Sequence, residues 1–250
     1  MRKIILSMVV AMSLFGMEQA SAQLFQKVEG NNEYVHVTQK VDDFYKVRMY
    51  NSFNVVYIQN PDSAGTVNIK VESSVLENLS IKSEDGELSL KLKGLGKKDY
   101  GIILVEIYSS SLSRVENDGG GVFESHQPVK ATELYLGVSG AGQIKMDSIN
   151  CDILKAKVAL GEGDLLLKGV AHRVDYSVLG GGEIRAHDMK SEEANCAITG
   201  NGNIGCHVLK KLSATITGAG NVYYEGNPEI SKKGIGKGKV LPIDAKEVVE

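Results

Sequence analysis

The amino-acid sequence predicts an all-β protein whose C-terminal half folds as a right-handed parallel β-helix, also called a β-solenoid. Three observations predict this fold. A Gly-x-Gly pattern recurs every 18 to 21 residues, apolar and polar residues alternate between the glycines, and no helical pattern follows any of them. The 28 glycines, the 4 prolines and the absence of tryptophan among 250 residues also suit a repetitive sheet protein.

The repeat has the form Gly-x-Gly-polar-aliphatic. Clear copies begin at Gly140, Gly161, Gly180, Gly200 and Gly218, and degenerate copies begin at Gly119 and Gly236. Twenty residues at ~3.3 Å each give a contour of ~66 Å, which suits one turn of a coil and is too short for a strand–helix–strand crossover. Stacked turns place equivalent residues above one another, and parallel connections favour a right-handed coil.

The glycines are interpreted as tight corners of this coil, where a Cβ would collide with the next turn. Loops that bind phosphate need a helix after the glycines, which is missing here. The turn that ends at Gly161 departs from the pattern, because Val158 and Leu160 are one place out of phase with their counterparts. An extra residue there predicts a β-bulge.

The chain divides into five predicted segments. Residues 1–22 have the basic start, short apolar run and Ala-Ser-Ala ending of a secretory signal peptide. Residues 23–43 are polar and are expected to form a mobile leader. Residues 44–118 contain irregularly spaced strands that would cap the first turn against edge-to-edge pairing. Residues 119–241 form the repeat, and residues 242–250 form a charged tail.

Composition and targeting limit the class of protein. A net charge of −3 at pH 7 argues against nucleic acid as a partner. The apolar run of the signal peptide is too short to span a bilayer, and no later stretch is long and apolar enough, so no transmembrane segment is expected. We therefore expect an exported protein that is periplasmic, associated with the outer surface, or extracellular.

Cysteine and histidine spacing gives no sign of a metal or a cofactor. Cys151, Cys196 and Cys206 are an odd number, so at least one thiol is unpaired, and any one disulfide stays open. Cys196 and Cys206 fall at inward positions, where cysteine behaves as a small hydrophobe. The five histidines are scattered, without the clustered spacing of metal ligands.

The sequence also resembles a known family. The segments Gly-Asn-Gly-Asn-Ile at 200–204, Gly-Ala-Gly-Asn-Val at 218–222 and Tyr-Glu-Gly-Asn-Pro at 224–228 are similar to the head GIN domain family of auto-transporter adhesins. The resemblance covers residues 44–240. It implies a secreted or cell-envelope β-helix of Bacteroides-type bacteria with an adhesin-like role, and it supplies no catalytic residues.

One column of polar residues is a candidate site. Each member follows the second glycine of a corner, and stacking would place Asp164 and Glu183 about 5 Å apart, with Glu162 nearby. Such carboxylates could serve as the pair of a retaining glycosidase or as ligands of Ca²⁺. The alternative, which we favour, is that this column bonds the corner backbone as a ladder.

Two outward tyrosines, Tyr135 and Tyr223, are candidate aromatic contacts for a glycan. The favoured function is a non-catalytic, adhesin-like binding or structural module, whose partner could be a glycan or an envelope protein. The alternative is a polysaccharide-binding or pectinase-like β-helix enzyme, although the short corners leave no long loops to wall a groove. A homo-oligomer is a third possibility.

Overall fold

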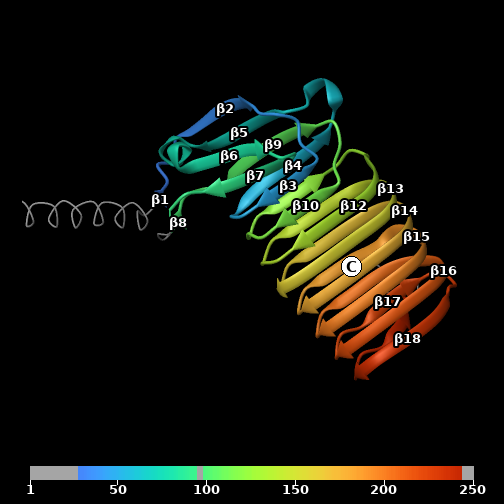
Figure 1. The fold of residues 1–250 in the computed structure, drawn as a ribbon. Helices are drawn as coiled ribbons and strands as arrows, with labels where there is room; N and C mark the ends of the chain where they lie inside the picture. The colour runs from blue at the N-terminus through green and yellow to red at the C-terminus, as the bar shows by residue number, and fades with distance from the viewer. Residues whose placement is uncertain (1–27, 95–97, 244–250) are drawn as a thin grey trace, which may run out of the picture.

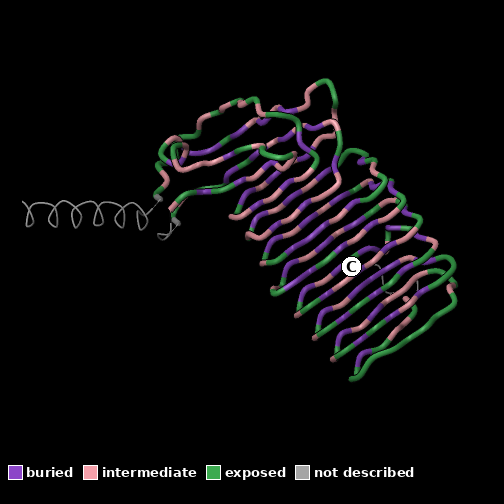
Figure 2. The backbone as a smooth tube through the Cα atoms, viewed as in Figure 1, coloured by how far each residue is buried: buried purple, intermediate pink, exposed green. Residues whose placement is uncertain are grey.

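The computed structural model describes residues 28–94 and 98–243, which form a β-solenoid of about six turns with an irregular N-terminal part. The turns stack as parallel rungs towards the lower right of the view (Figure 1). Buried and exposed residues alternate along each rung (Figure 2). These features confirm the predicted all-β solenoid. The proposed signal peptide, residues 1–22, lies outside the described residues.

The regular rungs consist of long strands that bend from side to side and, at the C-terminal end, of shorter strands. They are β12 (Val129–Val138), β13 (Gln143–Gly161), β14 (Asp164–Gly180), β15 (Glu183–Gly200), β16 (Asn203–Gly218), β17 (Val222–Glu225), β18 (Glu229–Gly236) and β19 (Val240–Pro242). All of them pair in parallel. Segments that precede the glycine corners form one outer surface, face A, and segments that follow the corners form another, face B.

Columns of aliphatic side chains fill the interior. On the inner side of face B, residues paired strand to strand form one column: Ile144, Leu165, Ile184, Ile204 and Val222. Each of these side chains is completely buried. Burying one such side chain contributes about 1.5–3 kcal/mol, so the column makes each rung the main support of the next.

The predicted bulge lies at Leu160. Val158 itself is in register with both Val138 and Val178, and the register shift falls between Ala159 and Gly161. Leu160 has a φ of 57° and is 82% exposed. The extra residue therefore turns outward, and the core column continues past it unchanged.

The first rungs are stacked out of sequence order. Their strands are β3 (Lys46–Met49), β4 (Phe53–Gln59), β7 (Glu87–Leu92), β9 (Ile103–Ser109), β10 (Arg114–Asn117) and β11 (Val122–Ser125). The rung of β3 and β4 lies between the rung of β7 and β9 on one side and the rung of β10 and β11 on the other. The chain thus makes the middle rung first.

A rung that runs in reverse covers the head end. It consists of β5 (Thr66–Glu72), antiparallel to β9, and β6 (Leu79–Glu84), antiparallel to β7. The remaining head elements are β1 (Val28–Glu29), β2 (Tyr34–Lys40), β8 (Lys98–Asp99) and the 3₁₀ helices η1 (Pro61–Ser63) and η2 (Ser73–Asn78). Reversal of direction ends the parallel stack at this end.

The prediction of a mobile leader over residues 23–43 is wrong for strand β2. This strand pairs antiparallel with β5 along its whole length, from Tyr34 opposite Glu72 to Lys40 opposite Thr66. Its valines at 35 and 37 point to the inner side of the sheet, while His36 and Thr38 point to the solvent side. This is the alternation of a half-buried edge strand. Residues 23–27 and most of the predicted tail, 244–250, lie outside the described residues.

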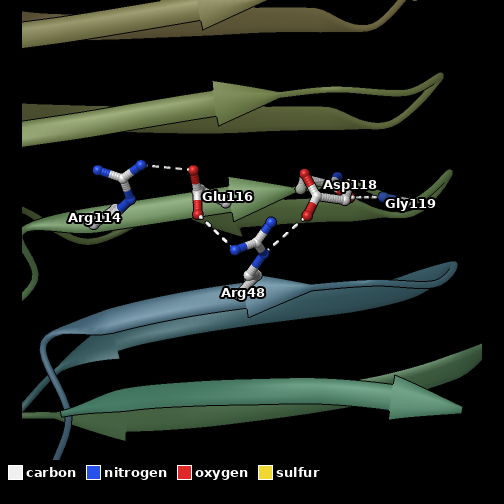
Figure 3. Close-up of polar contacts among 6 residues, drawn as sticks. Arg48, Arg114, Glu116, Asp118 and Gly119 are labelled. Atoms are coloured by element: carbon white, nitrogen blue, oxygen red, sulfur yellow. Dashed lines mark hydrogen bonds and ion pairs between the residues drawn. The ribbon is translucent and has the colours of Figure 1, made fainter. Parts of the chain in front are cut away.

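Polar side chains fasten the middle rung to its later neighbour. Arg48 of β3 donates to Asp118 over 2.9 Å and lies 3.6 Å from Glu116, while Arg114 bonds Glu116 over 2.7 Å (Figure 3). Because Arg48 is 37% exposed, we assign these ion pairs only ~1 kcal/mol of stability. Their main effect is to fix which strand lies beside β3.

Buried contacts hold the same rung from within. The Tyr57 ring of β4 stacks on Phe123 of β11, with ring centroids 5.9 Å apart. Its hydroxyl shares a 2.9 Å hydrogen bond with Ser109 of β9. Burial raises the pKa of Tyr57 to about 12. One side chain of the middle rung therefore contacts the rungs on both sides.

Glu72 latches the N-terminal strands to the cap. Its carboxylate is 3% exposed and accepts backbone N–H bonds from Asn32 over 2.8 Å and Gly101 over 2.6 Å. These bonds hold the pKa of Glu72 below its ordinary value of 4.5. The latch is therefore complete above that value and weakens as the pH falls through the lower, folded pKa.

We expect Glu72→Gln to loosen this latch, because the amide keeps one acceptor and loses the charge. Amide hydrogen exchange at Asn32 and Gly101 should become faster at neutral pH. The loss of protection of these two amides below pH 4.5, expected in the parent protein, should be absent in the variant. Glu77→Gln serves as the control. Unchanged exchange at both amides would contradict the latch.

The three cysteines are free thiols in the core. Their exposed fractions are 6% for Cys151, 2% for Cys196 and 0% for Cys206. A hydrogen bond with the Cys206 thiol and burial raise the pKa of Cys196, and burial raises the pKa of Cys151 to about 11. The prediction that Cys196 and Cys206 act as buried hydrophobes is confirmed.

These thiols should resist alkylation in the native protein, because the reactive species is the thiolate. Iodoacetamide at pH 8 is expected to leave all three unmodified in the folded state and to label all three in denaturant, as counted by mass spectrometry. Rapid native labelling of any one cysteine would show that its rung opens locally.

Candidate functional site

Face B is one outer surface that runs the length of the described chain. Residues at ten of its outward positions are paired strand to strand in a single row: Thr38, Asn68, Glu106, Val56, Glu124, Lys145, Leu166, Arg185, Gly205 and Tyr223. Gly205 is buried, because the His187 ring covers it. Neighbouring residues lie one strand spacing, ~4.8 Å, apart. An extended partner laid along this row would meet apolar, acidic, basic and aromatic groups in turn.

The head end of this face is hollowed. A cavity of about 450 Å³ lies over strands β2, β5, β9 and β4, which are neighbours in the sheet (Figure 1). Polar groups from three strands and the side chains of Leu104 and Val56 line it. Leu104 is 41% exposed, so the hollow offers apolar surface to a partner.

A chain of hydrogen bonds crosses the floor of the hollow. Thr38 donates to Asn68 Oδ1 over 2.8 Å, and Asn68 Nδ2 donates to Glu106 Oε1 over 2.9 Å. Tyr108 donates to the same oxygen over 2.7 Å, and this bond raises the pKa of Tyr108. The second oxygen, Glu106 Oε2, has no partner among the residues that the structure describes. The carboxylate is thus held in place with one acceptor free.

The predicted acidic pair lies on the same face, farther from the head. Asp164 and Glu183 are directly paired on β14 and β15, as their repeat positions predicted. Arg185 lies between them, 2.8 Å from Asp164 and 3.3 Å from Glu183. Asp164 also accepts a 3.4 Å bond from Gln143. Arg185 compensates both charges, which leaves the pair poorly suited to glycosidase or Ca²⁺ chemistry.

The rest of the polar column divides by residue type. The side chains of Asn203 and Asn221 accept backbone N–H bonds from the next rung, each over 3.0 Å. The predicted backbone ladder therefore exists at the asparagines, whereas Asp164 and Glu183 bond Arg185 instead. Glu162 is exposed on its corner.

The structure does not bring the two candidate tyrosines together. Tyr135 lies on face A, with the Arg114 guanidinium 4.1 Å from its ring centroid, and burial raises its pKa. Tyr223 lies on face B, where its hydroxyl accepts a 3.3 Å bond from Asn221. Only Tyr223 belongs to the surface that carries the hollow and the acidic pair.

The described ranges, 28–94 and 98–243, contain no group of three or more His, Cys, Asp or Glu side chains that could hold a metal ion. They also contain no helix that is long and apolar enough to cross a membrane.

The hollow was missed in the sequence because residue order conceals it. Its floor combines β2, which lies within the predicted leader, with β4, β5 and β9, and residues 73–102 separate β5 from β9 in the chain. The available signal was the alternation of exposed polar and apolar residues over 34–40.

A β-solenoid with short corners and a polar, partly hollow sheet face belongs to the class of elongated proteins that offer a surface rather than a deep pocket. Its sequence matches the model of the family described as "putative auto-transporter adhesin, head GIN domain" over residues 43–228. The chain therefore belongs to the head GIN domain family, as its corner motifs indicated.

Solved structures from Bacteroides and Parabacteroides species share the fold. A "putative adhesin" from Bacteroides fragilis has a TM-score of 0.81 at 22% identity, covering 87% of this chain and 100% of that one. A "putative adhesin" from Parabacteroides merdae has a TM-score of 0.72 at 26% identity, covering 87% of this chain and 99% of that one. A "putative lipid binding protein" from Parabacteroides distasonis has 0.72 at 23%, covering 88% and 100%. Comparison with curated proteins gave no match.

Proposed function

We propose that this protein is an exported, envelope-associated or extracellular adhesin-like module that binds an extended partner along face B and performs no chemistry on it. The observation that carries the proposal is the in-register row of ten outward positions ending in the hollow. Family membership supports an adhesin-like role and an envelope or extracellular location. The pairing of Asp164 and Glu183 with Arg185 argues against the pectinase-like alternative.

A matched pair of charge reversals tests this proposal. Lys145→Glu changes the middle of face B, and Lys157→Glu changes face A on the same rung. We expect the first variant to lose about tenfold or more of its retention on a glycan or envelope-protein array, since it replaces an ammonium donor in the row by a carboxylate that can only accept hydrogen bonds. The second should bind like the parent protein.

The same array reports on the alternatives. Release of reducing ends from a retained polysaccharide would favour the enzyme, and equal losses in both variants would contradict the assignment to face B. Light scattering of residues 23–250 separates binding as a monomer from binding through a homo-oligomer. The homo-oligomer stays a prediction.

A further inference from the structure

The hollow at the head of face B has the chemistry of a saccharide subsite. Glu106 is oriented by two donors from different strands, Asn68 and Tyr108, and keeps Oε2 free as an acceptor. Apolar surface from Leu104 and Val56 lies beside this carboxylate. A pyranose ring presents the same combination, with hydroxyl donors at its edge and C–H groups on its face.

Two basic side chains complete the hollow. His36 and Lys70 are directly paired on β2 and β5, and Lys70 is paired with Leu104 on β9. They can donate to ring or hydroxyl oxygens that Glu106, an acceptor, cannot bind. Tyr34 lies beside Lys70, whose ammonium is 5.6 Å from the centroid of the tyrosine ring. The Tyr34 side chain is 44% exposed. Donors, an acceptor and apolar surface therefore converge on one cavity of about 450 Å³.

Other ligand classes fit this surface less well. The hydrogen-bonded row of Thr38, Asn68 and Glu106 crosses the floor, and an acyl chain would bury the charged Glu106 carboxylate with its Oε2 unpaired. An added peptide strand would pair along the outer edge of β2, whereas the hollow lies on the face of the sheet. A sugar can satisfy the polar row and cover the leucine together.

We propose that the hollow binds one pyranose residue of a hydroxyl-rich glycan, with Glu106 Oε2 accepting a sugar hydroxyl and Leu104 contacting the ring face. This inference rests on the proposed function and names the partner of face B. The remaining units of the glycan would extend along the row towards Lys145 and Tyr223.

The test uses residues 23–250 and four probes: cellohexaose, maltohexaose, mannohexaose and vesicles of phosphatidylcholine. Glu106→Gln keeps the oxygen that accepts from Asn68 and Tyr108 and converts the free acceptor into a donor. We expect this variant to weaken binding of the retained hexasaccharide about tenfold or more. Glu193→Gln, the same change at an exposed residue of face A, should leave it unchanged, and matching melting temperatures show that both variants fold.

The outcomes separate this inference from the proposed function. Binding of a hexasaccharide that is weakened by Lys145→Glu and unaffected by Glu106→Gln overturns the subsite and leaves face B standing. Binding of vesicles alone, or of no hexasaccharide at millimolar concentration, also overturns the subsite. Equal weakening by Glu106→Gln and Glu193→Gln overturns it as well, since the effect would then be one of surface charge.

Discussion

Gly200→Ala is expected to lower the free energy of unfolding by about 3 kcal/mol. Gly200 has a φ of 124°, a backbone conformation that L side chains rarely adopt. A Cβ there would lie 2.5 Å from the carbonyl oxygen of Gly180 in the rung above. The obstructing atom is backbone, so the two rungs must separate to make room, and the aliphatic columns beside the corner lose contact.

Gly181, the middle residue of the preceding Gly-x-Gly corner, provides the control. A Cβ there meets nothing within 4 Å, and its φ is not positive. Gly181→Ala should therefore be neutral or raise the stability by ~0.4–1 kcal/mol, by restricting the unfolded chain. Urea unfolding of the two variants gives the comparison. Equal stabilities would contradict the view that rung stacking requires glycine at the first position of the Gly-x-Gly corner.

Asn117→Asp should destabilise the protein by about 3 kcal/mol at neutral pH, although it changes one amide into a carboxylate of the same shape. Asn117 is completely buried, and its Nδ2 donates to the carbonyls of Gly121 over 2.8 Å and Gln143 over 3.2 Å. Its Oδ1 accepts from the Gly119 amide over 3.1 Å. Aspartate can donate to neither carbonyl, although that of Gly121 keeps the Gln143 amide as a donor, and it buries a charge.

The pH dependence of this variant provides an internal check. A protonated aspartate can donate one hydrogen bond, so the stability difference from the parent should shrink as the pH falls through the raised pKa of the buried carboxyl. Asp118→Asn, the reverse change at the next, partly exposed residue, should cost no more than ~1 kcal/mol. A loss for Asn117→Asp that does not vary with pH would contradict this account.

Local periodicity predicted the regular rungs because each of their interactions repeats every 18 to 21 residues. The glycine corners, the inward cysteines and the bulge beside Gly161 follow from that spacing alone. The head could not be predicted in this way, since its pairing is not periodic. Nothing near Lys46 in the sequence indicates that its strand will lie between residues 87–90 and 114–117.

The candidate site shows the same division. The stacking of Asp164 on Glu183 followed from their repeat positions, whereas the bonds of both to Arg185 depend on side-chain direction, which the repeat does not specify. The hollow required the antiparallel partners of β5, and these come from segments that share no motif. Sequence reasoning thus located part of face B and missed its concave end.

The early placement of the middle rung has a consequence for how the molecule can change in length. Whole repeats can be added or lost between β13 and β16, because every rung there meets the next through the same columns. The head allows no such change, since β3 and β4 acquire their neighbours from residues 87–109 and 114–125. During synthesis, one edge of that first rung stays open until residue 109 has emerged, and the other stays open until residue 125 has emerged. The head therefore has a fixed number of rungs, and variation in the number of turns is confined to the regular rungs nearer the C-terminus.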